Sequence, residues 1–362
     1  MQVIDADAHI EEGVAAWEYL EPEFYRRRPI PVTFPADAAF GEHNAVWLID
    51  YKVRQSAANP TSMIRAQQKE ISIGSQELTD VGARLEDMDE VGIEKQVIYP
   101  SLWLGCLAED VELEAALARS YNEFMATQCN KSGGRLFYSA IVPFRRPEVA
   151  AAEVRRVRQM GSAASIFVRG MEWDMPIIHP MFRPIYEEAE RQELPMALHI
   201  GFGSPSISRM FEGMPRGEAG FRLPFVHPLG QGLLSFDLSK WALNQILTGT
   251  ILQDFPRLRW AVLETGSEWI LPAVWAAQRR KKKDLTGPFK DGQIFVTCEP
   301  DEDIAQVASC LGEDCLVIAS DMPHADDFRH ERPEEVWRER GDLSEATLTK
   351  LLRNNAQRLY KF

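Results

Sequence analysis

The length, composition and charge of the chain exclude several classes of protein. Its 362 residues are 45% hydrophobic and 26% charged, which is typical of a soluble globular enzyme with a sizeable core. A net charge of −14 argues against nucleic acid and anionic membranes as partners. The five cysteines form no CxxC pair, no apolar run could span a bilayer, and the N-terminus lacks a signal-peptide pattern. We therefore expect reduced thiols, no membrane partner and a cytoplasmic location.

The first predicted strand begins at Val3 and runs directly into Asp7 and His9. Because Asp7 and His9 are two residues apart, their side chains point the same way on an extended strand. A polar, proline-containing segment follows from residue 13 to 91. It shows no repeating strand signal and contains one short helix, 84–89, so we expect an insertion and not a separate domain.

Strands and helices alternate regularly after this insertion. The apolar, β-branched segments that predict strands are 95–100, 136–142, 164–169, 195–199, 258–264, 293–298 and 315–320. The segments with apolar residues at helical spacing are 110–130, 147–160, 181–192, 236–247, 267–283, 304–311 and 344–359. A second excursion, 201–228, is rich in Gly, Pro and Phe and follows the fifth strand.

Eight strands that alternate with helices predict a (β/α)8 barrel, also called a TIM barrel, of the α/β class. We expect one domain over residues 1–362, with long insertions after strands 1 and 5 that cover the barrel mouth. The apolar residues of these insertions could line a substrate cavity, or they could pack on each other or form a subunit contact. A doubly wound open sheet is the main alternative, but no glycine-rich phosphate-binding turn follows the first strand.

Charged side chains and histidines lie at the ends of most of the predicted strands. Their positions are Asp7, His9, Arg169, His199, Glu264, Glu299 and Asp321. In a (β/α)8 barrel these strand ends meet at one rim. Several carboxylates gathered there without a cation would be costly, so the pattern favours a metal site. The alternatives are structural: Asp321 or Glu299 could cap a helix, and a lone histidine could be a hydrogen-bonded core residue.

The chain resembles the amidohydrolase superfamily, in the branch that includes aminocarboxymuconate semialdehyde decarboxylase and the resorcylate and carboxyvanillate decarboxylases. The matching stretches, in chain order, are 4–9, 84–93, 194–199, 255–266, 320–324 and 354–356. The resemblance places the family's first-strand ligand pair on Asp7 and His9, its strand-five ligand on His199 and its strand-eight aspartate on Asp321. It also implies a homodimer.

This ligand set suits Zn²⁺, Mn²⁺ or Fe²⁺. We expect one divalent ion, with two as the alternative. Three positions depart from the family pattern. Asp7 stands where the family often has histidine, and Arg169 stands where two-metal amidohydrolases place a carboxylated lysine. Glu264 stands where the decarboxylases carry an acid/base histidine. Glu264 could move protons, bind a second cation or simply face a helix N-terminus.

The resemblance implies a metal-dependent hydrolase or decarboxylase (a lyase) acting on a carboxylated or carbonyl-bearing small molecule. The metal would act as a Lewis acid or activate a water. Asp321 would both bind the metal and shuttle a proton, with Glu264 or His227 as the general acid. Arg169 or Arg209 could hold a substrate carboxylate, although either could instead form a structural ion pair.

Two other classes of function remain open from the residues. A carboxylate-bridged di-iron hydroxylase would use a ligand inventory such as Asp7, His9, His199, Glu264, Asp321 and Glu299. A non-catalytic barrel that acts as a binding protein is the other, but the intact ligand positions argue against it. Glu12 and His324 are expected to lie next to the ligands.

Overall fold

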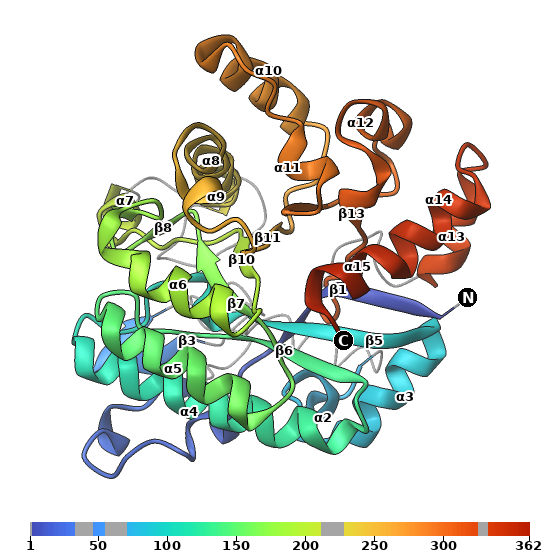
Figure 1. Cartoon of the computed structure of the whole chain (residues 1–362). Coiled ribbons are helices and arrows are strands. Elements are labelled where there is room, and N and C mark those ends of the chain that lie inside the picture. Colours follow the sequence, from blue (N-terminus) through green and yellow to red (C-terminus); the bar gives the residue numbers. More distant parts are fainter. Residues whose placement is uncertain (1, 33–45, 55–70, 211–227, 325–331) are drawn as a thin grey trace.

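The computed structural model describes residues 2–32, 46–54, 71–210, 228–324 and 332–362. At its centre is an eight-stranded sheet in the order β1-β5-β6-β7-β10-β11-β12-β13, in which neighbouring strands run parallel. The strands are β1 (Val3–Ile10), β5 (Ile93–Pro100), β6 (Leu136–Ala140), β7 (Ala163–Arg169), β10 (Met196–His199), β11 (Trp260–Val262), β12 (Ile294–Thr297) and β13 (Leu316–Val317). Helices lie between successive strands on the outside of this sheet (Figure 1).

The first and last strands meet and bring the two edges of the sheet together. The Ala6 amide donates to the Ile318 carbonyl at 3.1 Å, and the Asp321 amide donates to the Asp7 carbonyl at 2.9 Å. In Figure 1 the N-terminal β1 accordingly lies beside the C-terminal part of the chain. The predicted (β/α)8 barrel is therefore confirmed.

The main helices agree with the predicted spacing. They are α3 (Val81–Val91), α4 (Val111–Cys129), α5 (Pro147–Met160), α6 (Arg183–Arg191), α8 (Pro228–Thr248), α10 (Ile270–Lys281), α12 (Ile304–Leu311), α14 (Glu345–Thr349) and α15 (Asn355–Tyr360). Local capping sets some of these limits. The Asp80 carboxylate accepts from the Ala83 amide at 3.0 Å where α3 begins, and Gly92, at φ +78°, ends it. None of the described helices has both the length and the apolar composition that crossing a bilayer requires.

The first insertion contains strands that the sequence did not predict. A small antiparallel sheet forms from β2 (Ile30–Val32), β3 (Val46–Ile49) and β4 (Lys52–Arg54). The lack of a repeating strand signal between residues 13 and 91 therefore did not mean a lack of strands. Each of these strands is only three or four residues long, which is too short for a periodic pattern to be read. The placement of both insertions over the barrel mouth stays a prediction.

The first and last strands of the barrel, β1 and β13, differ in length from the prediction. β1 continues to Ile10, so Asp7 and His9 lie within the strand and not after it. β13 has only two residues, Leu316–Val317, instead of the predicted six. The backbone reverses soon afterwards, because Asp321 adopts a left-handed conformation with φ +53°.

Candidate metal centre

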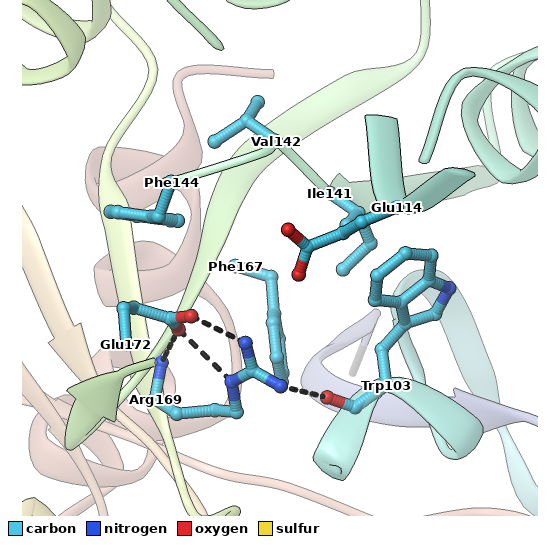
Figure 2. Close-up of a pocket in the computed structure, with 8 residues that line it drawn as sticks. All are labelled: Trp103, Glu114, Ile141, Val142, Phe144, Phe167, Arg169 and Glu172. Atoms are coloured by element: carbon cyan, nitrogen blue, oxygen red, sulfur yellow. Dashed lines mark hydrogen bonds and ion pairs between the residues drawn. The ribbon is translucent and has the colours of Figure 1, made fainter. Parts of the chain in front are cut away.

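The carboxyl ends of β6 and β7 hold a group of paired buried charges. Arg169, at the end of β7, donates from Nε to Glu172 Oε1 at 3.0 Å, and its Nη2 pairs with the other carboxylate oxygen. Its Nη1 donates to the carbonyls of Gly105, at 2.7 Å, and Trp103, at 3.2 Å. Figure 2 shows this pair beside the apolar ring of Phe167 in a pocket between β6 and β7. The structure thus supports the structural alternative for Arg169, a buried ion pair.

A second carboxylate of the same pocket also has a cation. Glu114 Oε2 accepts from Arg145 Nε at 2.8 Å, and the Trp173 indole donates to the other oxygen. The Arg145 guanidinium stacks on the Trp173 ring, 3.5 Å from its centroid. The pocket therefore contains acidic groups whose charge this chain already compensates.

An irregularity in β1 separates Asp5 from Asp7. Asp5 pairs with Gln96 and Ala8 with Ile98, so β1 uses one residue more than β5 over this span. Such a bulge re-aims the side chains that follow it. Regular alternation would place Asp5 and Asp7 on one face, but here Asp5 contacts the Gln96 side chain at 2.9 Å, whereas Asp7 faces the barrel interior.

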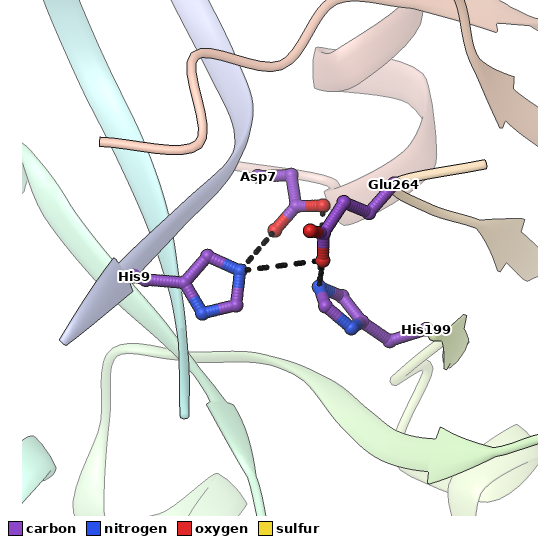
Figure 3. A group of neighbouring side chains, drawn as sticks. All are labelled: Asp7, His9, His199 and Glu264. Atoms are coloured by element: carbon purple, nitrogen blue, oxygen red, sulfur yellow. Dashed lines mark ion pairs between the residues drawn. The ribbon is translucent and has the colours of Figure 1, made fainter. Parts of the chain in front are cut away.

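Four ligand-type side chains converge inside the barrel (Figure 3). They are Asp7 and His9 from β1, His199 at the end of β10, and Glu264, two residues after β11. One ligand atom from each lies within 4.8 Å of the others. His199 Nε2 is 3.1 Å from Glu264 Oε2 and 3.4 Å from Asp7 Oδ2, and His9 Nε2 is 3.6 Å from Asp7 Oδ1. The structure thus brings together four of the five predicted metal-binding residues in one group.

Asp321, the fifth, lies against His9 in an adjoining group that also contains His324. Asp321 Oδ1 is 3.2 Å from His9 Nε2 and 3.0 Å from His324 Nδ1. The His324 ring stacks on His9 with 4.2 Å between centroids, and its Nε2 lies 2.8 Å from Ser101 Oγ. His324 was expected to lie next to the ligands. No pattern in the sequence predicted that it would contact both His9 and Asp321.

The donor set fits a divalent cation. His199 Nδ1 lies 2.9 Å from the Ile200 carbonyl, and a carbonyl can only accept, so Nδ1 carries the proton. In the neutral ring this leaves the lone pair of Nε2 directed at Asp7 and Glu264, which is how metal-binding histidines are oriented. Two imidazoles with carboxylates suit Zn²⁺, Mn²⁺ or Fe²⁺. Asp7, His9 and His199 could hold such an ion, with Glu264 in the same group and Asp321 against His9.

Burial and mutual charge shift the pKa values of this group upward. Burial, together with the charges of Asp321 and Asp7, raises the pKa of Glu264 to about 8. Burial alone would lower the pKa of His199, but the charges of Asp7 and Glu264 outweigh it and raise this pKa to about 9. Without a cation the site therefore holds protons near neutral pH, and a bound metal would displace them.

Glu264 and Asp321 share an uncommon backbone conformation. Their φ angles are +55° and +53°, in the left-handed region that side chains other than glycine rarely adopt. Each such residue costs about 1–3 kcal/mol and persists only where its surroundings enforce it, often at functional sites. The fold thus accepts this cost at two of the five predicted ligand positions.

The remaining predicted residues lie elsewhere. His227 falls outside the described residues. Glu299 belongs to neither ligand group among the described residues, and it is Glu302 that accepts from the Ser267 amide, at 2.6 Å, as a helix-capping carboxylate would. Arg209 is exposed and contacts Ser206.

Glu12 supports the loop that follows β5. It is buried, and its Oε2 accepts from the amides of Leu102, at 2.8 Å, and Ser101, at 3.2 Å. Because Ser101 also contacts the His324 ring, Glu12 is linked to the group around Asp321.

Comparisons with known proteins match most of the chain. A family model described as Amidohydrolase matches residues 4–362. The gamma-resorcylate decarboxylase of Rhodococcus jostii (strain RHA1) is 27% identical over 301 residues, which cover 77% of this chain and 86% of the relative. The gamma-resorcylate decarboxylase of Rhizobium sp. (strain MTP-10005) is 24% identical over 291 residues, with the same coverage of both chains.

Solved structures share the fold. An amidohydrolase from Mycobacterium avium subsp. paratuberculosis K-10 superposes with a TM-score of 0.77 at 19% identity, over 99% of each chain. The 5-carboxyvanillate decarboxylase from Novosphingobium aromaticivorans, solved with manganese and 3-methoxy-4-hydroxy-5-nitrobenzoic acid, gives a TM-score of 0.66 at 19% identity. That match covers 100% of this chain and 97% of the other. At these identities the likeness establishes the fold.

Proposed function

Because this chain belongs to the amidohydrolase family, and is thus an enzyme, we propose that it is a metal-dependent decarboxylase of an aromatic carboxylic acid. The observation that carries the proposal is the buried convergence of Asp7, His9, His199 and Glu264 at the carboxyl ends of the strands, where (β/α)8 enzymes carry their active sites. Similarity to decarboxylases of gamma-resorcylate supports a hydroxylated benzoate as substrate.

We assign one divalent ion to Asp7, His9, His199 and Asp321. The manganese in the related 5-carboxyvanillate decarboxylase makes Mn²⁺ the first ion to test. When bound, the ion supplies Lewis-acid polarisation of the substrate oxygen atoms. None of the relatives described above is named as an oxygenase or as an iron protein, so the di-iron alternative has no support. A homodimer and a cytoplasmic location stay predictions.

Decarboxylation replaces a carbon–carboxylate bond by a carbon–hydrogen bond, so the site must deliver one proton to a ring carbon as CO₂ leaves. We assign this proton to Glu264. Glu264 is a largely buried side chain at the site, and burial favours the protonated form of a carboxyl group, which can act as a general acid. Asp321, paired with His324 at 3.0 Å, is placed to return a proton to the site. His227 stays the alternative acid.

The proposal is tested with metal-free and metal-loaded protein. The apoprotein is loaded with Mn²⁺, Zn²⁺ or Fe²⁺, the ions per chain are counted, and CO₂ release is measured with gamma-resorcylate, 5-carboxyvanillate and related hydroxybenzoates. We expect one ion per chain and metal-dependent CO₂ release, with one deuterium at the vacated ring carbon in D₂O. Hydrolysis of esters or amides without CO₂ release would instead support the hydrolase alternative, and O₂ consumption with two irons the di-iron one.

A further inference from the structure

A buried polar cluster lies behind the metal centre, on the side of β1 that faces α3. We call it the clamp cluster and define it as Asp5, Arg84, Gln96 and Ser320. All four are buried, with at most 4% of any of them exposed. Asp5 belongs to β1, Gln96 to β5, Arg84 to α3, and Ser320 immediately precedes Asp321. No role in the proposed reaction has been given to any of them.

Arg84 connects the cluster to the two ligand-bearing segments. Its Nη2 donates to the His9 carbonyl and to the Met322 carbonyl, both at 3.2 Å, and its Nε donates to Gln96 Oε1 at 2.9 Å. His9 is a ligand residue and Met322 directly follows Asp321. One guanidinium therefore bridges the backbone of the first strand and the backbone after the last strand.

Asp5 holds the other side of Asp321. Its carboxylate accepts from the Ser320 amide at 2.9 Å, from Ser320 Oγ at 2.5 Å and from Gln96 Nε2 at 2.9 Å. The clamp cluster thus binds the residue before Asp321 and the residue after it. The bulge in β1 makes this possible, because it directs Asp5 away from the barrel interior while Asp7 stays inside.

We propose that the clamp cluster is a positioning device that sets the metal affinity of this site. The argument rests on the proposed function in one respect: it takes His9 and Asp321 as ligands. β13 ends at Val317, so Asp321 lies beyond the strand, where its amide donates to the Asp7 carbonyl at 2.9 Å. Hydrogen bonds that reach both neighbours of Asp321 hold its left-handed backbone and keep its carboxylate beside His9. Arg84 and Asp5 act through the ligands and do not touch substrate.

A matched control is present in the same barrel. Arg259 is also buried and also donates to two main-chain carbonyls, those of Leu359 at 2.7 Å and Glu193 at 2.6 Å. It precedes β11, at the end of the barrel away from the ligands. Arg84→Met and Arg259→Met each remove a guanidinium that donates to two main-chain carbonyls, and only the first affects residues adjoining the proposed ligands.

The experiment measures Mn²⁺ binding to each apoprotein by calorimetry and the bound ion by electron paramagnetic resonance. We expect Arg84→Met to weaken Mn²⁺ binding about 10- to 100-fold, as loss of an outer partner of metal ligands does, and to change the zero-field splitting of bound Mn²⁺. Arg259→Met should lower the melting temperature without either effect. Arg84→Lys should recover part of the affinity. Equal affinities for the two methionine variants would overturn the proposal.

A milder variant keeps the test decisive if Arg84→Met does not fold. Ser320→Ala removes one hydrogen bond to Asp5 and one from the Met322 amide, which lies 3.1 Å from Ser320 Oγ. It should weaken Mn²⁺ binding severalfold and alter the same resonance signal, and unchanged binding overturns the clamp. If the unmodified protein binds no Mn²⁺, Zn²⁺ or Fe²⁺, the metal assignment fails and the clamp with it. If it binds metal but releases no CO₂, the clamp test still applies and only the proposed reaction fails.

Discussion

Two regions of the barrel rim bury acidic side chains, and they differ in what balances the charge. Beside β6 and β7, Glu172 faces Arg169 and Glu114 faces Arg145, so each carboxylate has a guanidinium. Around β1, β10 and β11 the carboxylates of Asp7 and Glu264 face the imidazoles of His9 and His199. A buried ion pair completed within the chain is structural, whereas a group of carboxylates and imidazoles has the donor atoms that bind a divalent cation.

The largest effect should come from removing a ligand. Asp7→Ala deletes a carboxylate that faces both His9 and His199, so we expect loss of bound metal and a fall in kcat/KM of at least about 1,000-fold, measured by metal analysis and CO₂ release. Glu188→Gln is the control, because Glu188 is a buried carboxylate on α6 paired with Arg155 at 2.7 Å. If Asp7→Ala retained metal and activity, the contrast between the two regions would be lost.

The opposite outcome is expected beside β7. Glu172→Gln leaves the buried Arg169 guanidinium without its carboxylate, which should lower the free energy of unfolding by about 3–5 kcal/mol. Urea unfolding of the apoprotein measures this loss. The content of bound Mn²⁺ in the folded fraction should not change, and a loss of metal would mean that the two regions are not independent.

Glu264→Gln separates metal binding from proton transfer. The amide keeps the shape of the side chain but cannot donate a carboxyl proton, so kcat should fall about 100- to 1,000-fold, while Mn²⁺ content changes little. Steady-state kinetics and metal analysis measure the two effects. An unchanged kcat would remove Glu264 from the reaction and leave His227 as the candidate acid.

The pH dependence of stability sharpens the contrast further. Folding raises the pKa of Glu264 from 4.5 to about 8 and that of His199 from 6.5 to about 9. Both groups bind protons more tightly in the folded state, so their contribution is lost as pH rises through these values. We expect the stability of the apoprotein to fall as pH rises from 6 to 8, because the folded protein binds more protons than the unfolded chain in this range.

The Mn²⁺-loaded protein should behave differently in the same thermal or urea unfolding series. Metal binding requires deprotonated ligands and strengthens as pH rises. The gap in stability between loaded and metal-free protein should therefore widen from pH 6 to 8. A constant gap would show that no ligand titrates in this range.

The sequence allowed the barrel and much of the candidate site to be predicted. Alternating apolar segments indicated the strands, and the period of two along β1 correctly placed Asp7 and His9 on one face. His199 and Glu264 could be expected at the same rim because parallel strands end together. These inferences need only local patterns and one rule of topology.

Other features depend on contacts between distant segments, which no local pattern contains. The bulge in β1 sends Asp5 to the outer layer, although its spacing to Asp7 predicts a shared face. Arg169 was a candidate for substrate binding until the turn back from β7 placed Glu172 against it. The position of His324 depends on the left-handed backbone at Asp321. A residue other than glycine gives no indication of this conformation in the sequence.

The meeting of β1 with the segment after β13 has a consequence for the synthesis of the protein. Asp7 belongs to the first strand of the barrel and Asp321 follows the last, so neither barrel closure nor the proposed metal-binding group can form before the segment after β13 has been translated. The proposed ion would therefore bind after the barrel strands have been synthesised. A prematurely terminated product that lacks Asp321 would be unable to sequester the ion in this way.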